Sequence, residues 1–189
     1  MMDKLTLAIE FAAKAHDGMV RKKDKTPYIL HPLEAATIVG TMTSDQDVIS
    51  AAVLHDVVED TEITIDEIED LFGNRVRKLV ESETEDKRAD LPPEDTWKIR
   101  KEESLKVLKN AENVDVLMLW LGDKLANMRS FYRIWKVEGE SMWQSFNQKD
   151  PEQQFWYYST IAELTASLKK FSAWQEYNEL VKIVFRKDK

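Results

Sequence analysis

Four ionisable side chains fall within six positions of a segment that is otherwise apolar. The segment Val48 to Asp60 reads VISAAVLHDVVED and carries His55, Asp56, Glu59 and Asp60 near its end. Its apolar pattern predicts one buried helix, on which these groups occupy adjoining rows of one face. Unpaired buried carboxylates repel one another and are costly to desolvate, whereas a divalent cation neutralises them. The segment therefore predicts a metal site.

A second apolar run also carries polar groups at helical spacing. Asp123 and Asn127 lie four positions apart within VDVLMLWLGDKLANMR, so a helix presents both on one face. The residues before Asp123 are too apolar for a surface helix. We therefore expect this polar row to point into a sheltered site.

Composition limits the chemistry that these residues can perform. The 189 residues include no cysteine, which excludes disulfides, zinc–thiolate sites and cysteine nucleophiles, so any metal is held by His, Asp or Glu. A net charge of -8 opposes binding of nucleic acid over a broad surface. A small anionic substrate remains compatible with a local basic cluster, and residues 21–25 read RKKDK. That cluster is either a solvated turn or a phosphate-binding loop.

The elements that must position these groups are predicted to be helices, in an all-α fold. Glycine and proline number only five each, and period-two alternation is nearly absent. Helices are predicted over residues 4–17, 32–40 with His31 as N-cap, 47–60, 64–73, 97–108, 114–135, 151–170 and 172–185. Residues 83–94 are expected to form a mobile surface loop and residues 139–150 another loop.

One compact domain is expected for residues 1–189, with the motifs in about 4–135 and a helical C-terminal extension over about 151–186. The longest apolar run, Val116 to Leu121, is too short to cross a membrane. The first residues lack the pattern of a signal peptide, so the expected location is the cytoplasm.

The motifs resemble a known family. His31, then His55-Asp56, then Asp123 match the H…HD…D signature of the HD phosphohydrolase superfamily. The segments RKKDKTPYILHPL, AAVLHDVVEDT, FGNRVRKLV and GDKLANMR are similar to the hydrolase domain of RelA/SpoT-type enzymes and to small stand-alone alarmone hydrolases. The similarity runs from about Ala8 to Arg133. It implies a single helical HD domain.

The resemblance also implies roles for individual residues. The metal ligands would be His31, His55, Asp56 and Asp123, and two imidazoles with two carboxylates leave open positions that suit Mn²⁺ better than a closed zinc site. Glu59 would orient or deprotonate the attacking water, with Asp60 assisting. The expected substrate contacts are Arg21, Lys22, Asn127 and Tyr157. The implied substrate is (p)ppGpp, hydrolysed at the ribose 3′ position to pyrophosphate and GDP or GTP.

Alternatives remain open at the level of sequence. The same site would suit another phosphorylated nucleotide, such as an adenosine alarmone or NADPH. A metal-binding regulatory or antitoxin module without activity is a different class of answer, although retention of Glu59 and Asp60 speaks against it. The family usually has alanine where this chain has Gly122. His16 lies on an apolar stripe and is expected to be a core or supporting residue instead of a ligand.

Overall fold

The computed structural model describes residues 3–23, 25–88 and 90–186, and most residues in these ranges lie in helices joined by turns and loops. The only β-type pairing among them is an isolated bridge between Val20 and Pro27. The prediction of an all-α fold is confirmed.

Ten α-helices and two short 3-10 helices are assigned within the described ranges. They are α1 (Lys4–Ala15), α2 (Leu30–Gly40), α3 (Gln46–Leu54), α4 (Val57–Asp60), α5 (Ile65–Phe72), α6 (Asn74–Glu81), α7 (Pro93–Lys109), α8 (Val114–Glu138), η1 (Gly139–Ser145), α9 (Pro151–Leu164), η2 (Ala166–Leu168) and α10 (Ser172–Val184).

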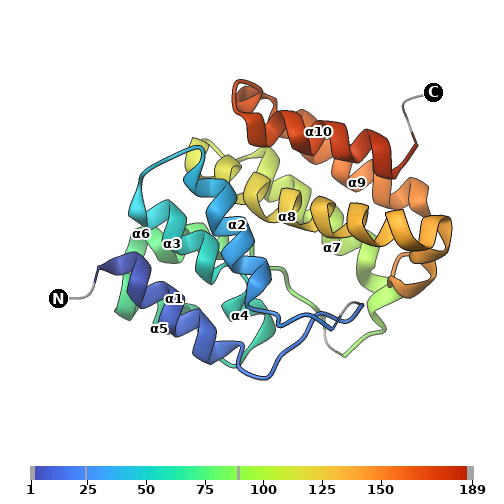
Figure 1. Ribbon diagram of the computed structural model, residues 1–189. Coiled ribbons are helices and arrows are strands. Elements are labelled where there is room, and N and C mark those ends of the chain that lie inside the picture. The colour runs from blue at the N-terminus through green and yellow to red at the C-terminus, as the bar shows by residue number, and fades with distance from the viewer. Residues whose placement is uncertain (1–2, 24, 89, 187–189) are drawn as a thin grey trace.

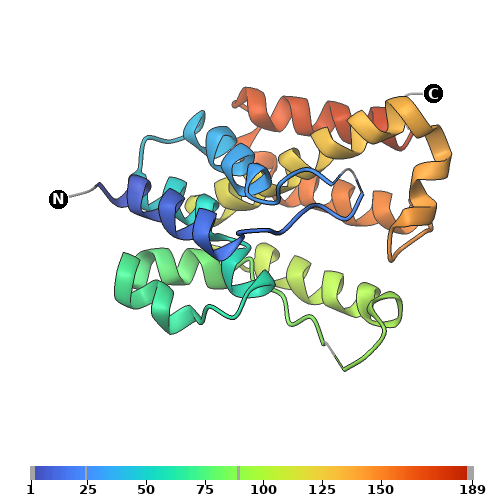
Figure 2. The same ribbon diagram turned by 60° about the horizontal axis from the view of Figure 1, so that its bottom comes forward.

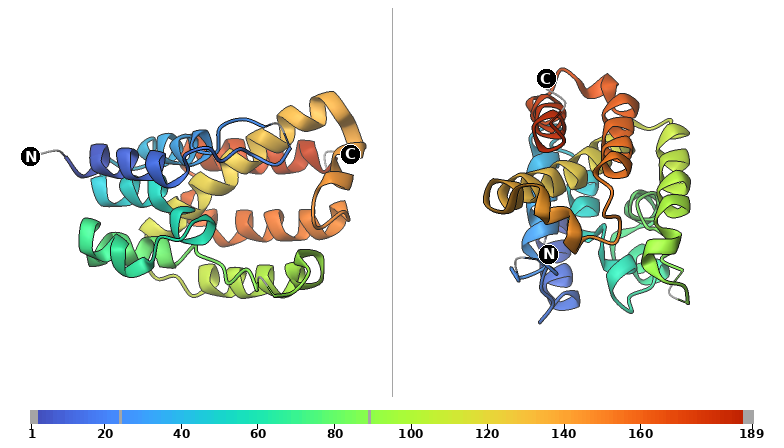
Figure 3. Two further views of the ribbon diagram at one scale, coloured as in Figure 1. Left: turned by 90° about the horizontal axis from the view of Figure 1, so that it is seen from below. Right: turned by 90° about the vertical axis from the view of Figure 1, so that its right-hand side faces the viewer.

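The long helix α8 is the centre of the packing. It contacts α2, α3 and α10, and Figure 1 shows it running through the middle of the molecule. Helices α1 and α2 also pack on α3. Figures 2 and 3 show α5, α6 and α7 along one side of the molecule, with α8, α9 and α10 on the other. The two segments that carry the candidate metal ligands, α3–α4 and α8, thus belong to one core.

Of two predicted helix starts, the one at Thr64 is confirmed and the one at His31 is wrong. Thr64 caps α5 in a full capping box with Glu67, and α5 ends at Gly73, as the pattern predicts. His31 is not an N-cap: α2 begins at Leu30, two residues before the predicted start at Pro32, and its N-cap is Ile29. This prediction was wrong because the turn that precedes Pro32 already has helical backbone geometry. His31 therefore lies within the first turn of α2.

The prediction of one continuous helix over residues 47–60 was also wrong. Helix α3 ends at Leu54 and α4 begins at Val57, so His55 and Asp56 occupy a turn between them. Consecutive residues of a regular helix point about 100° apart. The turn allows both side chains to face the same centre.

Both predicted loops contain helical residues and buried side chains, although Ala89 in the first of them lies outside the described residues. In the segment 83–94, the Glu83 and Glu85 side chains are buried, and α7 already begins at Pro93, a residue suited to the first turn of a helix. Residues 139–150 include the helix η1, which buries Met142 and Trp143. Neither segment has an apolar periodicity, so the sequence did not predict that these side chains are buried.

A glycine sets the spacing between α2 and α8. A Cβ atom at Gly122 would lie 2.6 Å from Cγ2 of Val39 and 3.0 Å from the carbonyl oxygen of Ala35. Both approaches are closer than ordinary packing allows, so the absence of a side chain lets the two helices come together. His31 and Asp123 lie on these same two helices.

Candidate metal centre

Three helical segments bring the predicted metal ligands together. One nitrogen of His31, one of His55 and one carboxylate oxygen of Asp123 lie within 4.8 Å of one another. His31 Nε2 is 2.9 Å from Asp123 Oδ1. Asp56 Oδ2 is 3.2 Å from His55 Nε2 and 3.5 Å from His31 Nε2. Asp56 thus lies beside the two histidines of the group that His31, His55 and Asp123 form.

The hydrogen bonding of His55 shows that this group suits a cation. Its Nδ1 lies 2.8 Å from the carbonyl oxygen of Ala52, which can only accept, so Nδ1 carries the proton. When Nε2 carries no proton, its lone pair faces the carboxylates of Asp56 and Asp123. Nε2 is buried and has no hydrogen-bond partner within the described part of the chain. Facing lone pairs repel unless a cation lies between them, and a divalent metal fits this donor set.

Electrostatics agree with this geometry. Burial opposes a charge on His55, but the carboxylates of Asp56 and Asp123 raise its pKa well above the usual value. Burial favours the neutral form of Asp123, yet Lys124, His31 and His55 hold its pKa well below the usual range. The site therefore attracts positive charge strongly.

A tyrosine that sequence analysis did not single out supports one of these ligands. Tyr28 Oη donates to Asp56 Oδ2 at 2.8 Å. The ring of His16 packs on Tyr28 with centroids 4.9 Å apart, and both His16 ring nitrogens lack hydrogen-bond partners among the described residues. Burial lowers the pKa of His16. His16 thus packs behind Tyr28 and lies outside the group of converging ligand atoms. The motif TPYILHP holds the signal for Tyr28, three residues before His31.

The two predicted catalytic carboxylates lie beside a lysine from another segment. Glu59 Oε2 accepts from the backbone N–H of Glu85 at 3.2 Å, and its Oε1 is 3.6 Å from Lys87 Nζ. Lys87 also pairs closely with Asp60. Burial, followed by the charge of Asp56, raises the pKa of Glu59 to about 7. A carboxyl group with this pKa can accept a proton near neutral pH.

Arg21 is linked to the predicted ligand Asp123 through Asn127. Arg21 Nη2 donates to Asn127 Oδ1 at 3.0 Å, and Asn127 Nδ2 donates to Asp123 Oδ1 at 2.8 Å. Arg21 and Lys22 line a cavity of about 360 Å³ that also includes Asp60. Asp24, in the same basic cluster, lies outside the described residues. The structure thus places Arg21 at the edge of the candidate metal centre, where it also lines a cavity of about 270 Å³ with His31, and places Lys22 in the neighbouring cavity.

Tyr157, the fourth predicted substrate contact, lies elsewhere. It is buried, and its hydroxyl has no hydrogen-bond partner in the described ranges. It lines a second cavity of about 210 Å³ with Arg100 and Lys101. Phe131 and Phe146 border both cavities, but Tyr157 does not line the one that contains Arg21 and Lys22. The structure therefore does not bring all four predicted contacts into one cavity.

Comparison with known proteins identifies the family. The model of the HD domain family matches residues 8–149, which is most of the chain. The chain belongs to the HD domain family.

This HD domain is 37% identical over 130 residues to a guanosine-3′,5′-bis(diphosphate) 3′-pyrophosphohydrolase of Aquifex aeolicus, covering 69% of the chain and 18% of that protein. It is 40% identical over 126 residues to a GTP pyrophosphokinase of Brucella ovis, covering 67% of the chain and 16% of that protein. The HD domain thus spans less than a fifth of these relatives.

Two solved structures match this chain over nearly their whole length, unlike the longer relatives found by sequence. A metazoan ortholog of SpoT that hydrolyses ppGpp has a TM-score of 0.72 and 26% identity, covering 99% of this chain and 96% of its own. A crystal structure from Listeria monocytogenes also has a TM-score of 0.72, with 32% identity over 82% of this chain and 99% of its own. Within the described residues, none of the helices has the length and apolar character needed to span a bilayer.

Proposed function

We propose that this HD domain is a metal-dependent phosphohydrolase that removes the 3′-diphosphate of (p)ppGpp. The observation that carries the proposal is the convergence of His31, His55, Asp56 and Asp123 beside Glu59 and a cavity lined by Arg21. Relatives that carry the names of (p)ppGpp enzymes, and a structural neighbour that hydrolyses ppGpp, support this substrate. The proposal also treats residues 1–189 as a single domain, and the packing of α10 along α8 supports this.

In this proposal the predicted ligands, Glu59 and Asp60 have distinct roles. The four converging ligands hold the ion, and their open N/O set favours Mn²⁺. A bound divalent cation supplies Lewis acidity, lowering the pKa of water and neutralising charge on phosphoryl oxygens. Glu59 accepts the proton of the attacking water, while Lys87 holds Asp60 beside it. Water adds to the phosphorus attached to the ribose 3′ oxygen, that P–O bond breaks, and the 3′ oxygen takes up a proton.

Chelation is expected to abolish turnover, and added Mn²⁺ is expected to restore it better than Mg²⁺. The physical reason is that imidazole ligands favour the softer ion. The measurement is release of pyrophosphate from ppGpp after dialysis against chelator and addition of each metal. Full activity in excess chelator, with no metal in the protein by elemental analysis, would refute metal dependence.

A substrate panel tests the identity of the nucleotide. With Mn²⁺ present, kcat/KM for ppGpp is expected to exceed that for an adenosine alarmone and for NADPH. A higher kcat/KM for either of the other nucleotides would show that the site acts on that nucleotide in preference to ppGpp. Absence of turnover with all of them would favour the metal-binding regulatory or antitoxin module.

The Arg21→Ala/Lys22→Ala double variant is expected to raise KM for ppGpp roughly tenfold or more with a smaller change in kcat, because charge-assisted contacts to phosphate are lost. Added salt is expected to raise KM of the parent protein in the same direction. The matched control is Lys169→Ala/Lys170→Ala, which removes two exposed positive charges outside the cavity lining. Equal KM values in the parent and the Arg21/Lys22 variant would show that these side chains do not bind the substrate and that the loop is a solvated turn.

A further inference from the structure

Two buried charged residues behind the metal centre have no role in the mechanism above. Lys124 directly follows the ligand Asp123 in α8, and its ammonium group forms a close ion pair with Asp123 Oδ2. Lys124 Nζ also lies 3.3 Å from Glu83 Oε1. Glu83 comes from the segment between α6 and α7, which sequence analysis assigned to a mobile surface loop. These contacts form the chain Asp123–Lys124–Glu83.

The two oxygens of Asp123 have separate partners. Oδ1 faces His31 Nε2 at 2.9 Å and accepts from Asn127 Nδ2 at 2.8 Å, while Oδ2 is bound by Lys124. The Lys124 ammonium therefore occupies the outer oxygen and leaves the inner one for the metal. It also brings a positive charge close to a site that must bind a cation, which opposes metal binding.

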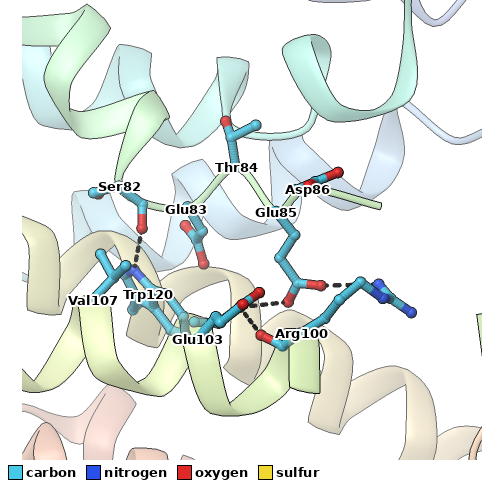
Figure 4. Close-up of a pocket in the computed structure, with 10 residues that line it drawn as sticks. Ser82, Glu83, Thr84, Glu85, Asp86, Arg100, Glu103, Val107 and Trp120 are labelled. Carbon is cyan, nitrogen blue, oxygen red and sulfur yellow. Dashed lines mark hydrogen bonds and ion pairs between the residues drawn. The ribbon is translucent and has the colours of Figure 1, made fainter. Parts of the chain in front are cut away.

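Glu83 is placed to offset that charge. Its side chain is 2% exposed, and Lys124 is its ion-pair partner among the described residues. Neither Glu83 oxygen has a hydrogen-bond partner in that part of the chain. Figure 4 shows Glu83 and Glu85 pointing toward α7 and α8, with Thr84 on the opposite side of the segment. The backbone beside Glu83 is held by the Trp120 indole N–H, which donates to the Ser82 carbonyl at 3.3 Å.

Glu85 provides a useful contrast within the same segment. It is also buried, but its carboxylate is bound by Arg100 at 3.0 Å, Lys101 at 2.6 Å and Ser104 at 2.9 Å. None of these partners is a predicted metal ligand. Glu85 is thus paired directly with Arg100 and Lys101, whereas Glu83 is paired directly with Lys124, the neighbour of Asp123.

We propose that Glu83 is a positioning residue for the metal centre, acting through Lys124. It holds the ammonium group on the outer oxygen of Asp123 and cancels its charge. Asp56 and Asp123 with Lys124 alone carry one net negative charge, and Glu83 restores the second, which matches a divalent cation. The inference rests on the proposed metal site but not on the identity of the substrate.

Glu83→Gln is expected to weaken Mn²⁺ binding roughly 10- to 100-fold, because an uncompensated ammonium then competes with the metal for Asp123. The dissociation constant is measured by Mn²⁺ electron paramagnetic resonance without nucleotide. A pH of 8 keeps Glu83 ionised, since burial raises its pKa to about 7. The matched control, Glu85→Gln, is expected to change the dissociation constant less than about threefold. An affinity for Mn²⁺ equal to that of the parent in Glu83→Gln would overturn the proposal.

The double variant Glu83→Gln/Lys124→Met separates charge balance from a general loss of structure. It removes both charges of the pair and keeps two net negative charges on the ligands, so Mn²⁺ affinity is expected to return to within about threefold of the parent. Thermal unfolding of the metal-free proteins is measured in parallel. If Glu83→Gln fails to fold, the double variant alone decides: binding tenfold weaker than that of the parent overturns the proposal. A protein that binds Mn²⁺ as expected but leaves ppGpp intact would refute only the proposed function.

Discussion

Asp56→Asn is expected to lose bound metal and hydrolase activity together. Asp56 Oδ2 lies 3.2 Å from His55 Nε2 and accepts from Tyr28 Oη at 2.8 Å, so the carboxylate is fixed toward the ligand cluster. An amide at this position removes the negative charge that the metal requires. The melting temperature in Mn²⁺ is also expected to fall, because metal binding no longer stabilises the native state. Elemental analysis, ppGpp turnover and thermal unfolding measure the three effects.

The matched control for this substitution is Asp70→Asn. Asp70 is an exposed carboxylate of α5 and is not among the converging ligands. Its replacement is expected to leave metal content, activity and the melting temperature in Mn²⁺ close to those of the parent. Stoichiometric metal in Asp56→Asn would show that Asp56 is not required as a ligand.

Glu59→Gln is expected to keep its metal while kcat falls by roughly 10² to 10⁴, the range for loss of a positioned general base. Glu59 lies on α4, where the backbone N–H of Glu85 and the ammonium of Lys87 hold its carboxylate. Glutamine preserves the shape and one acceptor oxygen but cannot take up the proton. Single-turnover rates with ppGpp, together with metal content, separate this effect from that of Asp56→Asn.

Glu62→Gln serves as the control for Glu59→Gln, since Glu62 is exposed just beyond α4. It is expected to retain the kcat of the parent. A Glu59→Gln enzyme that turns over at the parental rate, or that loses its metal, would show that the roles assigned along this segment are incorrect.

The sequence was most informative where a polar residue interrupts an apolar helix. His55, Asp56 and Asp123 stand out because burying them is costly, and the structure places them beside one another. The turn at His55 and Asp56 could not be predicted, because the apolar pattern continues through it. Its geometry depends on the interaction of His55 Nδ1 with the Ala52 carbonyl oxygen and on contacts with other helices.

The surroundings of the site were harder to predict. Glu83, Glu85 and Lys87 lie in a run of charges that is typical of a solvated loop. Their ion-pair partners lie far along the chain. Lys101 pairs with Glu85 and Lys124 pairs with Glu83, and no local sequence pattern links these residues. Local signals report that a side chain is polar, but burial of that side chain depends on distant segments.

The close contact at Gly122 has a consequence for how the metal centre can vary. His31 is carried by α2 and Asp123 by α8, so the separation of these ligands follows the distance between two helix axes. A methyl group at position 122 would meet Val39 and Ala35 and would push the helices apart. The spacing of two predicted metal ligands thus depends on Gly122, which is not itself one of the converging residues. A change of this one residue would thus alter the distance between His31 and Asp123 without replacing either side chain.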